Sequence, residues 1–241
     1  MGRTLVIGDI HGGFKALEQI LERAEVTTDD KLIFLGDYVD GWSESFEVIN
    51  LLISLKYSHN CIFLKGNHDE LFYEWLHKGK DNPNWLLHGG QATIDSYKDR
   101  SYNFIKIHSF FLENLDNYYL DTENRLFLHA GFTNVKGIEQ EHFSKLFYWD
   151  RSLWETALAA RELSKDDEFY PERLKLYKEV YIGHTPLSKI NRDEPFFASG
   201  VWNVDTGAAF TNPLTIMDID SKEFWQSDPL PSLYPNEKGR N

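Results

Sequence analysis

The sequence predicts an α/β fold whose first part is a parallel β-sheet. Short apolar runs at Thr4–Ile7, Leu32–Leu35 and Cys61–Leu64 end near a glycine, as buried strands often do. Between them, Phe14 to Ala24 and Phe46 to Lys56 carry apolar residues at helical spacing. This alternation of strand and helix requires crossover connections, so the first 65 residues are expected to form parallel neighbouring strands.

The later sequence predicts further strands and two helical regions. Apolar runs of the same kind are found at Leu126–Leu128, Val180–Ile182, Val201–Val204 and Leu214–Ile219. Residues 70–120 and the heavily charged stretch 142–179 are expected to be mostly helical. From about residue 227 the chain lacks periodicity and holds three of its eight prolines, which predicts an irregular tail on the surface or a frayed one. Without a Ser/Gly-rich linker, residues 1–241 are interpreted as a single domain.

Composition restricts the classes of partner. The chain has 25 Lys and Arg against 38 Asp and Glu, a net charge of −13, which argues against nucleic acid or an anionic membrane as partner. An anionic substrate is still compatible with this charge. The single Cys61 excludes an internal disulfide and favours a reducing compartment. The longest apolar stretch, Val48 to Leu55, is too short to span a bilayer, and the first residues lead directly into a strand, so a cytoplasmic protein is expected.

Polar residues follow almost every expected strand. The segments are Gly8-Asp9-Ile10-His11-Gly12, Gly36-Asp37-Tyr38-Val39-Asp40-Gly41, Gly66-Asn67-His68-Asp69, His129-Ala130-Gly131 and Gly183-His184-Thr185. The carboxyl ends of parallel strands share one edge of a sheet, where ligands bind. One such segment alone is more often structural, but five of them, each after an apolar strand, predict one shared site.

The residue types at these strand ends suit metal ions. Carboxylate, amide and imidazole ligands without thiolates favour Mn, Fe or similar divalent ions over a structural zinc site. Three oxygen ligands and three imidazoles suffice for two ions that share one carboxylate. Such a pair, ~3.5–4 Å apart, activates water and stabilises both oxygens of a phosphoryl displacement.

The ordered series of segments resembles the calcineurin-like metallophosphoesterases. It is most similar to their bacterial and phage-type serine/threonine phosphoprotein phosphatases, and the likeness runs from about Thr4 to Asp220. The resemblance implies a fold of two packed mixed β-sheets flanked by helices, which adds a second sheet to the one expected from periodicity. It also implies two divalent metal ions, with Mn favoured and Fe, Zn or a mixed pair as alternatives.

The same resemblance assigns roles to the strand-end residues. It makes Asp9 and His11 ligands of the first ion, Asp37 the bridge, and Asn67, His129 and His184 ligands of the second. His68 would be the general acid that protonates the leaving alkoxide, held in position by a hydrogen bond that it donates to Asp40. The attacking group would be a hydroxide that bridges the two ions.

One position departs from the family pattern. The family's phosphoprotein phosphatases carry Arg-Gly after the second aspartate of the Gly-Asp-Tyr-Val-Asp segment, and that arginine contacts phosphate, whereas this chain has Gly41-Trp42. Arg151, in Trp149-Asp150-Arg151, is the candidate for binding the phosphate oxygens; the alternative is a surface ion pair of little energetic value. Trp42 is interpreted as a cover over the site or a stacking surface for a substrate ring.

These observations predict an enzyme that hydrolyses phosphomonoesters. Serine/threonine protein phosphatase is the favoured activity. The loss of the arginine at Gly41 also leaves open a hydrolase of dinucleoside polyphosphates or other small phosphate compounds. A pseudo-phosphatase that only binds phosphorylated partners is a third reading, which the intact His68 and Asp40 disfavour because a binding protein needs no general acid.

Overall fold

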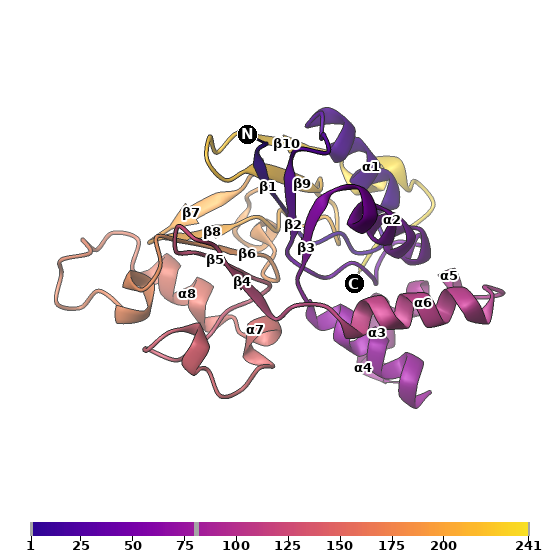
Figure 1. Cartoon of the computed structure of the whole chain (residues 1–241), viewed down its shortest axis with the longest axis horizontal. Coiled ribbons are helices and arrows are strands. Elements are labelled where there is room, and N and C mark those ends of the chain that lie inside the picture. Colours follow the sequence, from indigo (N-terminus) through magenta and orange to yellow (C-terminus); the bar gives the residue numbers. More distant parts are fainter. Residues whose placement is uncertain (1, 80–81, 241) are drawn as a thin grey trace.

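Two five-stranded β-sheets form the centre of this computed structural model, which describes residues 2–79 and 82–240 (Figure 1). The first sheet has the order β10 (Phe224–Gln226), β9 (Thr215–Asp218), β1 (Thr4–Ile7), β2 (Lys31–Phe34) and β3 (Asn60–Phe63). The second has the order β4 (Tyr118–Leu120), β5 (Arg125–Leu128), β6 (Glu179–Ile182), β8 (Val201–Asn203) and β7 (Phe196–Ala198).

Each sheet is mixed and has a parallel core. Strands β1, β2 and β3 pair in parallel, as the early strand–helix alternation predicted, and β5, β6 and β8 do the same in the second sheet. Antiparallel strands flank both cores: β9 and β10 in the first sheet, β4 and β7 in the second. The arrangement of two mixed sheets confirms the fold that the family resemblance implied.

Side chains alternate between the two faces of each sheet, and both faces are buried. In β1, Val6 points into the layer between the sheets, while its neighbours Leu5 and Ile7 pack with the helices outside. In the second sheet Phe127 and Tyr181 belong to the inner layer, where their rings stack 4.8 Å apart. The sheets therefore pack face to face, and helices cover their outer faces.

The helices divide between the two outer faces. On the first sheet lie α1 (Phe14–Arg23) and α2 (Ser45–Ser58), followed by the helical region α3 (Asn67–Lys78), α4 (Pro83–Trp85), a wide helical turn at Leu86–Gly90, α5 (Gln91–Ser96) and α6 (Tyr102–Glu113). The second sheet packs against α7 (Leu146–Trp149) and α8 (Ser152–Ala159). Short 3₁₀ turns occur at Ile138–Gln140, Glu172–Lys175 and Leu187–Ile190. The expectation of mostly helical structure over residues 70–120 is thus confirmed for the described residues.

The expectation for residues 142–179 is wrong. Only α7, α8 and one 3₁₀ turn are helical there, and residues 160–171 form turns. Short polar side chains compete with helical hydrogen bonding in this stretch: Asp167 Oδ1 accepts from the backbone N–H of Phe169 at 2.8 Å. Pro171 then prevents a helix from continuing through this position.

The stretch after residue 227 is largely irregular but is anchored to the body of the protein. It contains one helical turn, α9 (Leu230–Leu233), and both Leu230 and Tyr234 are buried. The Tyr234 ring stacks on Trp42 with ring centroids 5.1 Å apart. This stretch therefore packs against the first sheet's helices and does not fray up to residue 240.

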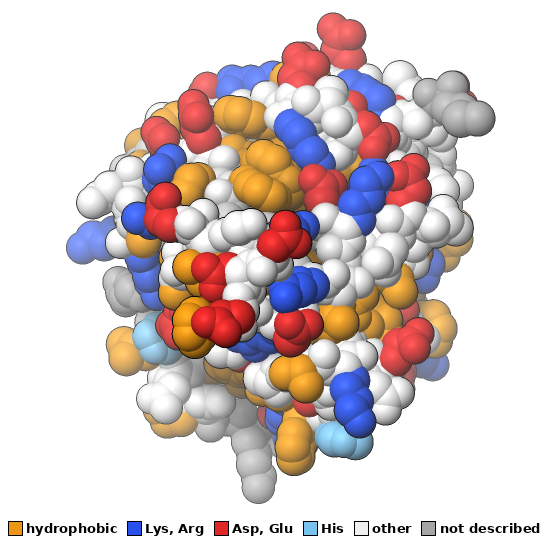
Figure 2. Space-filling model, turned by 90° about the vertical axis from the view of Figure 1, so that its left-hand side faces the viewer, with side chains coloured by type: hydrophobic (Ala, Val, Ile, Leu, Met, Phe, Trp, Pro, Cys, Tyr) orange, Lys and Arg blue, Asp and Glu red, His pale blue; other side chains and the backbone are white. Residues whose placement is uncertain are grey.

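Charged side chains of both signs mix on the outside of the molecule. Figure 2 shows the face that lies on the left of Figure 1, where acidic and basic side chains are interspersed with apolar ones. Within residues 2–79 and 82–240, no helix combines the length and the apolar character needed to cross a membrane.

His108 in α6 is buried. Its Nε2 lies 3.0 Å from Asn50 Oδ1, which can only accept, so Nε2 carries the proton and Nδ1 accepts from the Tyr97 hydroxyl at 2.8 Å. Burial, with a smaller contribution from the charge of Arg100, lowers the pKa of His108 to about 4. The imidazole is therefore neutral in the folded protein at neutral pH.

This shift predicts a loss of stability in mild acid. Between the folded pKa of about 4 and the ordinary value of 6.5, the unfolded chain binds more protons at His108 than the folded chain does. The free energy of unfolding should consequently fall as pH drops through this window, by about 2 kcal/mol at pH 5 relative to pH 8. Urea unfolding of the wild type and His108→Gln across this range should show a weaker pH dependence in the variant; equal dependence would contradict the assignment.

Candidate active site

The loops that follow β1, β2, β3, β5 and β6 meet at one edge of the two sheets. Several of their polar residues adopt left-handed backbone angles, with φ of 51° at His11, 53° at Asp37, 73° at Asp40 and 65° at His184. Such angles cost about 1 kcal/mol or more for each residue with a side chain. Bonds between loops hold them: the Asp37 carbonyl accepts from the N–H groups of Ile10 at 3.0 Å and His11 at 2.9 Å.

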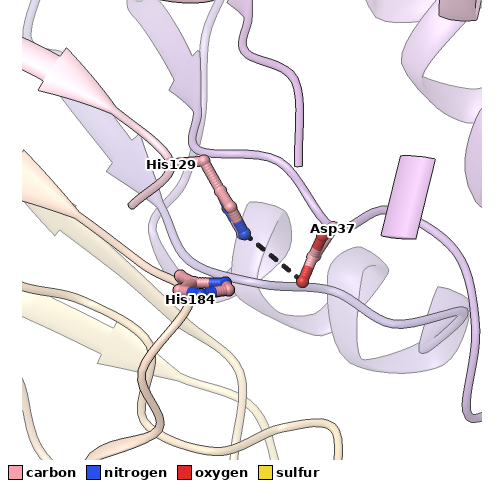
Figure 3. A group of neighbouring side chains, drawn as sticks. All are labelled: Asp37, His129 and His184. Atoms are coloured by element: carbon pink, nitrogen blue, oxygen red, sulfur yellow. Dashed lines mark ion pairs between the residues drawn. The ribbon is translucent and has the colours of Figure 1, made fainter. Parts of the chain in front are cut away.

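Two buried triads of possible metal ligands share one carboxylate. Asp9, His11 and Asp37 form the first, and Asp37, His129 and His184 form the second. Figure 3 shows the second triad, in which all three side chains converge from different loops. An oxygen of Asp37, Oδ2, lies 3.4 Å from His129 Nε2 and 3.5 Å from His11 Nε2, so it stands between the two histidines.

His11 and His129 make their hydrogen bonds to backbone carbonyls through Nδ1. Nδ1 of His11 faces the carbonyl oxygens of Val39 and Asp40 at 3.1 and 3.0 Å, and Nδ1 of His129 faces the Leu35 carbonyl at 2.9 Å. A carbonyl can only accept, so each Nδ1 carries a proton and each Nε2 presents its lone pair toward Asp37. This is the tautomer that a metal ligand requires.

Several buried polar atoms of the site lack a donor or face another acceptor. Among the described residues, Asp9 Oδ1 and His184 Nε2 are buried without a hydrogen-bond partner. Asn67 Oδ1 lies 3.2 Å from His129 Nε2, which places two acceptor atoms face to face. A cation between such atoms removes this repulsion, so the donor set fits metal ions, with Asn67 beside the second triad.

Burial makes the ionised form of these carboxylates costly unless positive charge lies nearby. Burial and the charges of Asp205 and Asp37 raise the pKa of Asp9 well above its usual range. Burial also opposes ionisation of Asp37, but the neighbouring His129 and His68 hold its pKa well below the usual range. Bound divalent ions would neutralise these carboxylates, activate water and stabilise negative charge on phosphate oxygens.

Two glycines before the ligands are required by close packing. A Cβ on Gly66 would lie 2.1 Å from Asp37 Oδ1, and one on Gly183 would lie 2.0 Å from Asp9 Oδ1. Any side chain at these positions would displace a carboxylate of the first triad. The close approach of a carboxylate therefore explains both glycines.

His68 and Asp40 form a buried pair next to the triads. His68 Nδ1 lies 2.6 Å from Asp40 Oδ2, and the His68 ring is 5.1 Å from the His11 ring. The Asp40 carboxylate is held by two further donors, Trp85 Nε1 at 2.5 Å and Thr93 Oγ1 at 2.6 Å. The imidazole is therefore oriented by a carboxylate that is itself fixed at both oxygens.

Sequence reasoning missed two of the groups that hold these loops. Thr93 carried no signal, because a single threonine in α5 is unremarkable until Asp40 lies beside it. The Asp69 carboxylate accepts from Gly66 N–H at 2.9 Å. It also accepts from the N–H groups of Asp37 and Tyr38, each at 2.8 Å, and so fixes the loop that carries the shared carboxylate.

A cavity of about 780 Å³ opens next to Asn67 and His68. Its lining includes the cationic and aromatic side chains Arg151, Lys189, Arg240, Trp85, Trp149 and Phe210. Burial and the charges of Arg151 and Arg240 lower the pKa of Lys189, because the three cations lie near one another. Arg151 is exposed, lines the cavity and, within residues 2–79 and 82–240, has no ion-pair partner.

Trp42 has neither of the roles that the sequence suggested. Its side chain is fully buried, does not line the cavity, and donates from Nε1 to the Ala208 carbonyl at 2.8 Å. It packs beneath Tyr234 and Gly239, so it supports the stretch after residue 227 and cannot stack on a substrate ring. The aromatic side chain open to the cavity is Trp149, which is 44% exposed.

Comparison with known proteins identifies the family. The model of the calcineurin-like phosphoesterases matches residues 2–203. The chain belongs to the calcineurin-like phosphoesterase family. This phosphoesterase is thus a metal-dependent hydrolase, and its two buried triads are consistent with the dinuclear metal site that the sequence predicted.

Relatives of this phosphoesterase include two curated enzymes. Both are named asymmetrical bis(5'-nucleosyl)-tetraphosphatase PrpE. That of Oceanobacillus iheyensis is 25% identical over 91% of this chain and 89% of its own length, and that of Anoxybacillus flavithermus is 24% identical over 90% and 91%. A protein serine/threonine phosphatase structure from Saccharomyces cerevisiae has the same fold, with a TM-score of 0.65, 15% identity, and coverage of 95% of this chain and 83% of that one.

Because Asp37 belongs to both triads, we predict that its charge is needed to bind both ions. Asp37→Asn keeps the shape of the side chain and tolerates the left-handed backbone. We expect Mn²⁺ affinity to fall by about 100-fold or more, since even residues that only support a ligand contribute about 10- to 100-fold. Titration calorimetry of metal-free protein measures this loss directly.

Two controls accompany this variant. Asp228→Asn removes an exposed carboxylate that pairs with Arg23 and should bind Mn²⁺ as the wild type does. Thermal unfolding without metal verifies that Asp37→Asn is folded. Wild-type Mn²⁺ affinity and stoichiometry in Asp37→Asn would contradict the bridging role.

Proposed function

We propose that this protein hydrolyses dinucleoside polyphosphates, cleaving a phosphoanhydride bond next to the dinuclear metal site. The observation that carries the proposal is the cavity beside the triads, whose wall holds three cations and open aromatic side chains. Its volume of about 780 Å³ lies in the range of roughly 300–1,000 Å³ that is typical for sites of drug-sized ligands. The names of the two curated relatives support the same substrate class.

The charges of the cavity suit a polyphosphate chain. Arg151, Lys189 and Arg240 all line the cavity, and Lys189 lies near both arginines, in a protein whose net charge is −13. A single phosphate beside two divalent ions has little need for three further cations, whereas a chain of phosphates extends its charge away from the metals. Within this proposal Arg151, the sequence candidate for phosphate binding, contacts phosphates along the chain.

An aromatic side chain is available for a base. Trp149 is 44% exposed, lines the cavity and lies with its ring 6.4 Å from that of His184. A purine stacks favourably on such a surface, typically by about 1–3 kcal/mol per base. Its position next to a proposed metal ligand would hold the nucleoside close to the reacting phosphate.

The roles of the ligands and the dyad complete the proposal. Asp9, His11 and Asp37 would hold one ion, and Asp37, Asn67, His129 and His184 the other. His68, oriented by Asp40, would donate its proton to the oxygen that leaves phosphorus. The metal is expected to be Mn, with Fe, Zn or a mixed pair as alternatives.

A second candidate is a serine/threonine protein phosphatase, the activity that the sequence favoured. The observation that supports it is the buried His68–Asp40 pair. An alkoxide is a poor leaving group that needs a proton, whereas a nucleotide phosphate leaves readily without one. The dyad is thus most useful for a phosphomonoester of an alcohol, and the two candidates have to be separated by substrate.

A substrate panel separates them. With Mn²⁺-loaded protein, we expect kcat/KM for diadenosine tetraphosphate to exceed that for a phosphoserine peptide. Trp149→Ala should raise KM for the dinucleotide by about 10-fold through the lost stacking and leave 4-nitrophenyl phosphate hydrolysis unchanged. Preference for the phosphopeptide would support the protein phosphatase in place of our proposal.

The role of His68 is tested by leaving groups. His68→Asn should lower kcat for phenyl phosphate by about 10²- to 10⁴-fold, because the phenolate formed needs a proton. The loss for 4-nitrophenyl phosphate should be clearly smaller, since nitrophenolate is a better leaving group. Equal losses for both esters would assign His68 a structural role, and the Mn²⁺ content of the variant serves as the control.

A further inference from the structure

We propose that Arg240 binds the phosphoryl group at the metal site, and that residues 229–240 form a strap that delivers its guanidinium there. Arg240 lies far in sequence from the strand-end segments, which all precede residue 186. The inference depends on the phosphoesterase activity that the family shows and holds for either substrate class proposed above.

The guanidinium of Arg240 reaches the first triad. Its Nη1 donates to His11 Nε2 at 3.3 Å, and the side chain lines the cavity with His68. Because His11 Nε2 is the nitrogen proposed to bind metal, the guanidinium has to turn away from it when an ion is bound. Among the described residues the buried Nε has no hydrogen-bond partner, so the guanidinium keeps a donor free. Two bound metal ions alone would repel the guanidinium in this place. A phosphoryl group bound to both ions would attract it instead. The position is therefore suited to a bound phosphoryl group.

Two glycines leave room for the stem of Arg240. A Cβ on Gly41 would lie 3.1 Å from Arg240 Cγ, and one on Gly89 would lie 3.2 Å from the same atom. The two glycines are themselves joined by a hydrogen bond from Gly41 N–H to the Gly89 carbonyl at 3.2 Å. The methylene stem passes over this pair, so the space at position 41 is filled by a side chain from the other end of the chain.

Contacts with Trp42 and with the neighbouring Ser43 hold the strap in place. Tyr234 stacks on the Trp42 ring, and a Cβ on Gly239 would lie 2.8 Å from that ring, so the backbone runs directly over it. The Glu237 carboxylate accepts from Ser43 N–H at 3.0 Å and from Ser43 Oγ at 2.7 Å. These contacts give the buried Trp42 a function: it is the surface on which the strap rests.

Arg240 itself is also held in place by neighbouring residues. The backbone N–H of Arg240 donates to the Ala209 carbonyl at 2.8 Å, and the neighbouring Ala208 carbonyl accepts from Trp42. The guanidinium carbon lies 5.6 Å from the centre of the Phe210 ring. A backbone bond and an aromatic contact thus limit where the side chain can point, and a preoriented guanidinium binds phosphate with two parallel hydrogen bonds.

The experiment compares Arg240→Ala with Lys238→Ala, which removes an equal charge from an exposed position of the same stretch. Inorganic phosphate is the probe, measured as a competitive inhibitor of 4-nitrophenyl phosphate hydrolysis and by calorimetric titration of the Mn²⁺-loaded protein. We expect the phosphate dissociation constant of Arg240→Ala to rise by about 10- to 100-fold, as for loss of one charge-assisted hydrogen-bonded contact. Lys238→Ala should match the wild type.

Affinity for Mn²⁺, measured on metal-free protein, should not fall in Arg240→Ala, because the side chain removed is a cation that contacts His11 and repels the ions. Wild-type phosphate affinity in this variant would overturn the proposal. So would tighter Mn²⁺ binding with faster turnover, which would make Arg240 a plug of the metal site. Because phosphate and 4-nitrophenyl phosphate contain no nucleoside, these results do not depend on whether dinucleotides are the substrate.

A second variant tests the strap. Glu237→Ala removes the carboxylate that holds Ser43 but leaves Arg240 intact. We expect phosphate affinity to fall by several-fold, less than in Arg240→Ala, and the double variant to lose no more than Arg240→Ala alone. Additive losses in the double variant would overturn the positioning role. Thermal unfolding of each variant verifies that the protein is folded.

Discussion

The burial of one carboxylate, that of Asp37, organises the whole active site. It belongs to both metal triads, its Oδ1 accepts from the His68 N–H at 2.9 Å, and its backbone carbonyl ties down the loop that carries His11. An ionised carboxylate without solvent is costly unless charges and donors surround it. The loops around it are consequently arranged to supply histidines, hydrogen bonds and a place for cations, even at the cost of left-handed backbone angles.

The packing of the two sheets is what brings those groups together. Loops from β1, β2 and β3 contribute the Asp9, Asp37 and Asn67 segments, and loops from β5 and β6 contribute His129 and His184. The apolar layer between the sheets, with the stacked Phe127 and Tyr181, fixes their separation. A change in this layer would shift Asp37 relative to His129 and His184. The packing of the core therefore controls the geometry of the site.

The net charge of the protein is negative, whereas the charged side chains that line its cavity are positive. The sum of −13 describes an acidic exterior, yet Arg151, Lys189 and Arg240 line the cavity beside the triads. Positive charge is placed where an anionic group would bind, and the metal ions would add to it. An acidic protein can in this way act on phosphate compounds without a basic surface that attracts polyanions in general.

The sequence by itself determined the strands that carry the site and the residues proposed as metal ligands, because both follow from local patterns. Strand periodicity located β1, β2, β3, β5 and β6, and the polar residues after them are the ones that converge. The prediction of helices over the charged residues 142–179 was wrong. A helix-forming composition without apolar periodicity does not produce a helix where local side-chain hydrogen bonds stabilise turns. Only the tertiary structure brought Thr93 to Asp40 and Arg240 to His11. These contacts join residues 53 and 229 positions apart, and no local pattern encodes a partner at that distance.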